Sequence, residues 1–147
     1  MSFLKSIDKV LAGMGNMKAM QRTHVDTFTE DKMQTLEGEK IAESENGEIW
    51  IEYQELAGYM FMNVSILSRF NIKTKQRCKM IFLGNTNLDL VSDNDETDSD
   101  FSNVSNRWLT KMSFDISKED IKYINNKSAD QVRIEFKKKF ILFNIIK

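Results

Sequence analysis

Apolar side chains recur three or four positions apart in the first twenty residues. This spacing predicts an amphipathic helix over 1–20, with charged side chains on the remainder of the helical wheel. Its apolar face is the candidate interaction face and consists of Leu4, Ile7, Leu11 and Met14. For residues 21–38 we expect an irregular or edge-strand connection.

From residue 39 onward the apolar period changes to two, which is typical of strands. Asn46-Gly47 lies between two such runs, and this dipeptide is a strong hairpin signal because both residues tolerate positive φ. We therefore expect a hairpin over 39–55. Further strands are expected over 59–70, 76–84, 88–90 and 107–116, and in the last of these Leu109 alone departs from the alternation.

The C-terminal part carries a helix signal followed by two further runs of period two. Ser117 precedes Lys118, Glu119 and Asp120, which is the pattern of an N-cap with acids in the first turn. A short helix should follow. The runs on either side of Lys137-Lys138-Lys139 then suggest a terminal hairpin. Because these lysines include no Gly or Asn, a bulge or one bent strand stays open as an alternative.

Together these elements predict an α+β domain that is mainly antiparallel β, either a sandwich or a partly open barrel, with an N-terminal amphipathic helix and a short helix before a C-terminal hairpin. Residues 39–147 would form the β-rich part of one domain. The expected core consists of Ile49, Ile51, Met62, Val64, Met80, Phe82, Leu90, Trp108, Met112, Phe114, Ile121, Val132, Ile134 and Phe136.

Composition narrows the class of protein. The 147 residues include no proline and one cysteine, and their net charge of -1 gives no general basic field. We therefore expect no nucleic-acid partner. No run approaches the ~18 apolar residues of a membrane span, so we expect no transmembrane segment and a soluble, cytoplasmic protein.

Charge alternates in sign along the chain. Residues 41–56 carry five Glu and no base, 57–83 carry five bases and no acid, and 84–104 carry six acids and no base. Residues 105–147 carry ten bases against five acids. We expect these segments to pair within the molecule. Lys137-Lys138-Lys139 could contact phosphates, but exposed lysines also commonly guard strand edges.

The sequence contains few candidates for metal-binding or catalytic residues. The acidic stretch 93–100 resembles a calcium loop, but an EF-hand beginning at Asp93 would need glycine at Asp98 and glutamate at Val104, so we expect a solvated connection. Cys78 alternates with Met80 and Phe82 and reads as a buried side chain, and His24 lies in no nucleophile motif. Glu52 and Glu55 suggest a solvated strand edge rather than a catalytic pair. We assign no catalytic, cofactor or metal residue and expect no enzyme activity.

The absence of a catalytic constellation and the charged strand faces favour a non-catalytic binding or adaptor domain. A protein partner or self-association would suit the amphipathic N-terminal helix. The alternative is a carrier of a small apolar ligand, since Met and Phe side chains could line a soft cavity inside a β-barrel.

Overall fold

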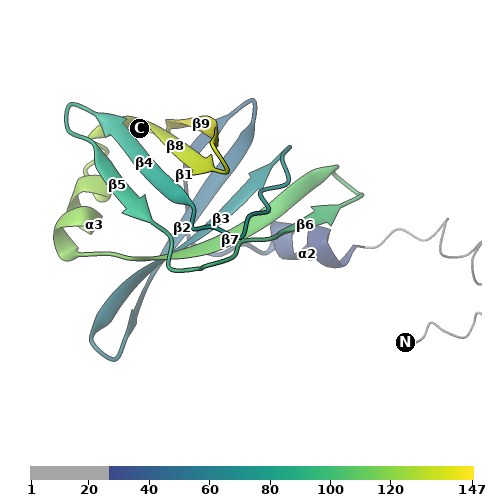
Figure 1. The fold of residues 1–147 in the computed structure, drawn as a ribbon, viewed down its shortest axis with the longest axis horizontal. Coiled ribbons are helices and arrows are strands. Elements are labelled where there is room, and N and C mark those ends of the chain that lie inside the picture. Colours follow the sequence, from purple (N-terminus) through teal and green to yellow (C-terminus); the bar gives the residue numbers. More distant parts are fainter. Residues whose placement is uncertain (1–26) are drawn as a thin grey trace, which may run out of the picture.

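A computed structural model describes residues 27–147. The predicted helix over 1–20, its face Leu4, Ile7, Leu11 and Met14, and His24 lie outside the described residues. The described part contains one antiparallel sheet in the order β5-β4-β8-β9-β1-β2-β3-β7-β6 (Figure 1). Its strands are β1 Glu39–Ser44, β2 Gly47–Leu56, β3 Tyr59–Ser68, β4 Lys79–Gly84, β5 Leu88–Val91, β6 Ser99–Ser102, β7 Arg107–Asp115, β8 Ala129–Phe136 and β9 Lys139–Ile145.

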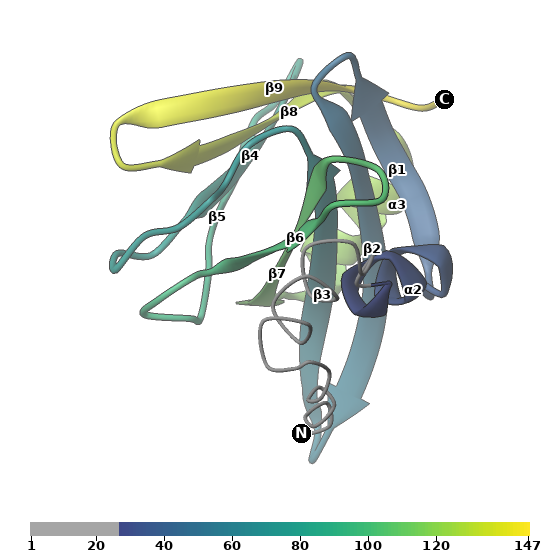
Figure 2. The same cartoon turned by 90° about the vertical axis from the view of Figure 1, so that its right-hand side faces the viewer.

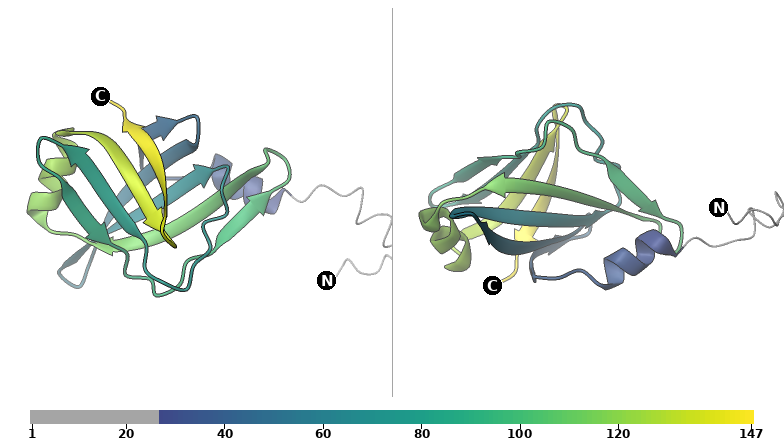
Figure 3. Two further views of the ribbon diagram at one scale, coloured as in Figure 1. Left: turned by 45° about the horizontal axis from the view of Figure 1, so that its top comes forward. Right: turned by 90° about the horizontal axis from the view of Figure 1, so that it is seen from below.

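The sheet curls into a half-barrel, which confirms the predicted α+β, mainly antiparallel fold (Figure 3). Its two ends approach each other through the segments that flank β4 and β6. Thr74 and Thr97 form an antiparallel bridge, and the Ile72 amide donates to Ser99 Oγ at 2.9 Å. These hydrogen bonds join the two ends of the sheet where strand pairing stops.

The inner face of the half-barrel holds the main core. Of the predicted core residues, all are buried except Trp108 and Ile121, which are half-buried. Ile121 still packs against the core cluster, and the Trp108 ring lies 4.9 Å from that of Phe101, centroid to centroid. The strand alternation therefore identified the inner face correctly.

Helix α3, Lys118–Asn125, confirms the predicted short helix. Ser117 Oγ accepts from the Asp120 amide at 3.1 Å, and Asp120 Oδ2 accepts from the Ser117 amide at 3.3 Å. This reciprocal pair is a capping box. Ile124 anchors the helix in the main core at one end of the half-barrel (Figure 1).

Helix α2, Phe28–Gln34, corrects the expectation of an irregular or edge-strand connection over 21–38. It has seven residues and no side-chain hydrogen bond at its N-cap, so its local signal is weak. The helix lies on the outer face of the sheet (Figure 2), where Met33 packs against Leu67 and Leu109. Leu109 breaks the alternation because it contacts this helix on the outer face.

The acidic connection differs from expectation, whereas the C-terminal hairpin agrees with it. The acidic stretch 93–100 contains the start of a strand, β6, which pairs Ser99 with Thr110 and Asp100 with Leu109. The terminal hairpin is confirmed, and β8 and β9 are joined by Lys137 and Lys138 alone, with φ values of 50° and 64°. This two-residue turn excludes both the bulge and the continuous bent strand.

Candidate functional site

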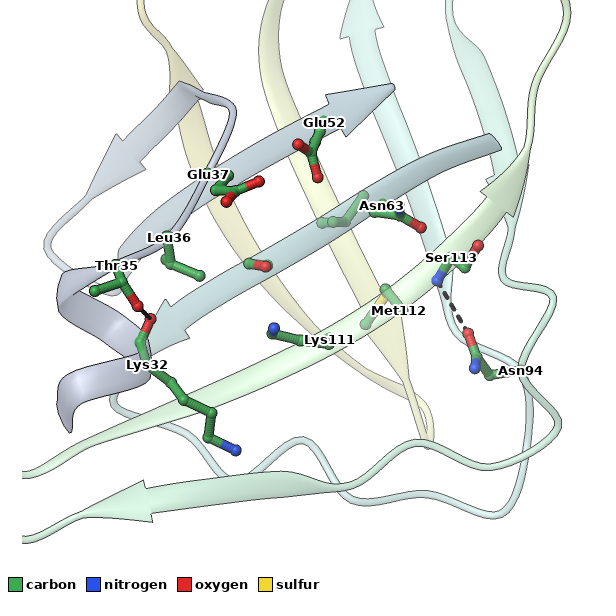
Figure 4. Close-up of a pocket in the computed structure, with 12 residues that line it drawn as sticks. Lys32, Thr35, Leu36, Glu37, Glu52, Asn63, Asn94, Lys111, Met112 and Ser113 are labelled. Carbon is green, nitrogen blue, oxygen red and sulfur yellow. Dashed lines mark hydrogen bonds between the residues drawn. The ribbon is translucent and has the colours of Figure 1, made fainter. Parts of the chain in front are cut away.

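The candidate site is a polar groove on the outer face of strands β2, β3 and β7, with a volume of about 460 Å³ (Figure 4). Helix α2 and the residues after it form one wall, and Asn94 stands at the opposite side. Such a volume lies within the range of ordinary ligand sites, but here polar side chains dominate the lining.

Strand register explains the polar floor. Glu52 pairs with Asn63, and Asn63 pairs with Ser113 across the three strands. Ser65 pairs with Lys111 in the next outward-facing row. Because side chains alternate between faces, the residues between these positions point into the core. The groove is therefore built on rigid strands.

The helix wall is fixed by a carboxylate under α2. Glu30 accepts hydrogen bonds from Ser105 Oγ and Ser102 Oγ, both at 2.7 Å, and from Gln34 Nε2 at 2.9 Å. These donors, led by Ser105, lower the pKa of Glu30 to about 2. Lys32 reinforces the attachment through Asp100 Oδ2 at 3.2 Å.

The opposite wall comes from the acidic connection. Asn94 Oδ1 accepts from the Ser113 amide at 3.0 Å, and Asp93 Oδ1 accepts from the Asp115 amide at 3.3 Å. The Asp93 amide in turn donates to the Ser113 carbonyl at 2.8 Å. The acidic side chains are solvated as predicted, but the backbone beneath them is attached to β7.

Three charges of the groove are unmatched. Within the part of the chain that the structure describes, Lys111, Glu37 and Glu52 form no ion pair, although all three line the groove. Figure 4 shows Glu37 and Glu52 on one side of the groove and Lys111 on the floor. A ligand that carries both signs of charge could satisfy them.

The charge segments pair only in part. Arg107 and Glu48 join the last and first charged segments at 3.9 Å, and Arg77 and Asp95 join neighbouring segments at 3.3 Å. The bases of 57–83 all lie after strand β3, so they do not face the acids of β2 across the ladder. Opposite charges of these two segments therefore do not face each other across the β2–β3 ladder.

The residues considered for catalysis do not come together. Cys78 is buried, its Sγ lies 3.7 Å from Thr97 Oγ1, and burial raises the pKa of its thiol. Glu52 and Glu55 are three positions apart on β2 and so point to opposite faces. Among residues 27–147, no group of three or more His, Cys, Asp or Glu side chains is placed to hold a metal ion.

The interior of the half-barrel, where the carrier hypothesis places its ligand, contains closely packed side chains. Phe82, Phe114, Phe143, Met62 and Met80 are all less than 2% exposed. In the described part of the chain no observation favours an apolar carrier, which stays a prediction. Neither helix described by the structure is long and apolar enough to cross a membrane.

The chain matches no family model, no curated protein and no solved structure.

Sequence reasoning missed the groove because helix α2 was missed. The sequence did contain a signal for this helix. Leu109 and Leu67 are both apolar residues on the otherwise polar face of their strands. Two such neighbours indicate that something covers the outer face. The alternation also placed Lys111 on the outer face, but it could not show which charges lie nearby.

Proposed function

We propose that this domain is a non-catalytic binding or adaptor module that holds a polar peptide segment of a partner protein in the groove beneath α2. The observation that carries the proposal is Lys111, which lies unpaired in the same groove as Glu37 and Glu52. A peptide with both acidic and basic side chains complements this arrangement. The cytoplasm remains the expected compartment.

The polar floor supports peptide recognition over an apolar ligand. Asn63 and Ser65 on β3 and Ser113 on the adjacent β7 offer hydrogen-bonding side chains at half-buried positions. Hydrogen bonds to charged groups contribute about 1.5–3 kcal/mol each.

A peptide library displayed on phage tests the proposal. Peptides selected on the full chain are measured by fluorescence polarisation against the parent protein and Lys111→Glu. We expect Lys111→Glu to weaken binding at least tenfold, because about 1.4 kcal/mol corresponds to a factor of ten. Lys122→Glu is the matched control, since Lys122 is an exposed lysine on α3 away from the groove.

Amide chemical shifts show where on the domain the peptide binds. Bound peptide should shift the resonances of 63–65 and 111–113 and leave those of α3 in place. If no peptide is enriched, or if the enriched peptides bind Lys111→Glu as tightly as the parent, the proposal is wrong.

A further inference from the structure

A second surface, which is strongly basic, lies at the β8–β9 turn. Four cations precede or begin β4 at alternate positions, and three more form or follow the turn. They are Lys73, Lys75, Arg77, Lys79, Lys137, Lys138 and Lys139, which we call the basic cluster. All seven are exposed.

Alternation explains why the first four point outward. Four of the even positions, Ile72, Thr74, Cys78 and Met80, are buried, whereas Gln76 lies at a bend and is exposed. The odd positions therefore face solvent. Pairing of Lys79 with Glu135 then brings this segment beside the end of β8 and its turn.

The basic cluster lines two grooves that meet at the turn. One, of about 430 Å³, is lined by Lys73, Lys75 and both turn lysines. The other, of about 270 Å³, is lined by Arg77, Lys79, Lys139 and the same turn lysines. Lys137 and Lys138 line both, so the two grooves adjoin at the turn and together form a cationic path.

Acids lie beside the Lys73 and Lys75 part of this path, because Glu96 and Asp98 flank Thr97, the bridge partner of Thr74. Glu135 lies in it but is paired with Arg133 at 2.9 Å. Asp95 pairs with Arg77 at 3.3 Å and is 85% exposed. The six lysines form no ion pair in the part of the chain that the structure describes. Their mutual repulsion favours a bound anion.

The turn gives an independent reason to look for a ligand. Lys137 and Lys138 both adopt the left-handed backbone conformation, which Asn-Gly adopts at lower cost in a two-residue hairpin. Strain of this kind is often retained where the side chains have a role. Here the side chains that the strained turn presents are the two lysines shared by both grooves.

We propose that the basic cluster binds single-stranded nucleic acid, with phosphates along the lysines. Phe140 follows the turn, is 62% exposed and lines the smaller groove, so it offers a ring for a base to stack on. A cationic groove with an exposed aromatic ring is the usual arrangement for this ligand. Arg133 lies 5.4 Å from the centre of that ring, and its own charge is balanced by Glu135.

The shape of the surface favours a linear strand over other polyanions. The cations line grooves on both sides of a turn, whereas an anionic bilayer would contact a flat or convex surface. An acidic peptide could follow the same path but would make less use of Phe140. The inference revises the expectation of no nucleic-acid partner, which was based on the net charge of the whole chain.

Fluorescence anisotropy with a labelled oligonucleotide of about ten nucleotides tests the inference on the full chain, since single-strand sites span roughly 4–16 nucleotides. The decisive variant is Lys137→Asn with Lys138→Gly. It removes two charges and gives the turn its preferred residues, so it should fold with an unchanged or higher Tm. We expect its affinity to fall at least tenfold at low salt.

Salt dependence adds a second readout. Each phosphate contact contributes about 0.7 to the slope of log affinity against log salt for single strands, so losing two contacts should reduce the slope by about 1.4. Lys73→Gln with Lys75→Gln should give a similar reduction. Lys118→Gln with Lys122→Gln, which removes two exposed lysines of α3, should leave affinity and slope unchanged.

Three results would overturn the inference. The first is no binding by the parent protein at low salt. The second is an equal loss of affinity in the α3 control. The third is equal or tighter binding to poly-glutamate or to vesicles containing phosphatidylserine, which would assign the basic cluster to an acidic protein or a membrane instead. Peptide binding at Lys111 uses different residues, so either proposal can fail without the other.

Discussion

The two helices of the described chain are held by different means. Helix α3 has its own capping box and inserts Ile124 into the main core. Helix α2 has no side-chain cap and packs through Met33 on a separate small cluster with Leu67 and Leu109. We infer that α3 belongs to the cooperative unit of the half-barrel, whereas α2 can open locally and with it one wall of the groove.

The largest expected effect is on stability, and it should differ between the two helices. Ile124→Ala should lower the free energy of global unfolding by about 2–5 kcal/mol, because it leaves a cavity in the main core. Met33→Ala removes a side chain that is equally well buried, at 5% exposed against 7%. Its effect should fall mainly on the local opening of α2.

Urea denaturation and amide hydrogen exchange measure the two free energies. In Met33→Ala the amides of 28–34 should exchange faster while those of β3 and β7 stay protected. If both variants lower global stability equally, and α2 exchanges together with the sheet, then the two helices belong to one cooperative unit and the comparison fails.

A smaller effect concerns the caps. Ser117→Ala removes one half of the capping box and should cost about 1 kcal/mol of global stability. Thr27→Ala is the matched control, because Thr27 occupies the N-cap of α2 without a side-chain cap hydrogen bond. Its effect should stay within about 0.5 kcal/mol. If urea denaturation shows equal losses of unfolding free energy in Ser117→Ala and Thr27→Ala, the difference in capping does not affect stability.

The same contrast explains what the sequence could reveal. Signals confined to a few neighbouring residues were sufficient for α3, for the core-facing alternation of the strands and for the first hairpin, although its turn is Glu45-Asn46 rather than Asn46-Gly47. Helix α2 depends on Leu67 and Leu109, which are more than thirty residues away along the chain. The groove and the basic cluster each combine distant segments, so their residues could be recognised individually but not assembled.

The last prediction concerns the pH dependence of α2. The hydrogen bonds from Ser105, Ser102 and Gln34 lower the pKa of Glu30 from 4.5 to about 2, and Arg107 contributes in the same direction. A carboxyl whose pKa is lower in the folded protein stabilises the fold above the unfolded value. This contribution is lost as the pH falls from about 4.5 to about 2.

Glu30→Gln isolates that contribution, because the other carboxyl groups titrate in both proteins. Above about pH 4.5 the amides of 28–34 should exchange faster in the variant than in the parent, since a neutral amide oxygen accepts weaker hydrogen bonds than a carboxylate. The difference in opening free energy should shrink as the pH falls and disappear near pH 2. A difference that stays constant over this range would mean that the charge of Glu30 does not hold α2 against the sheet, and that Met33 and its two leucine neighbours alone keep this wall of the groove in place.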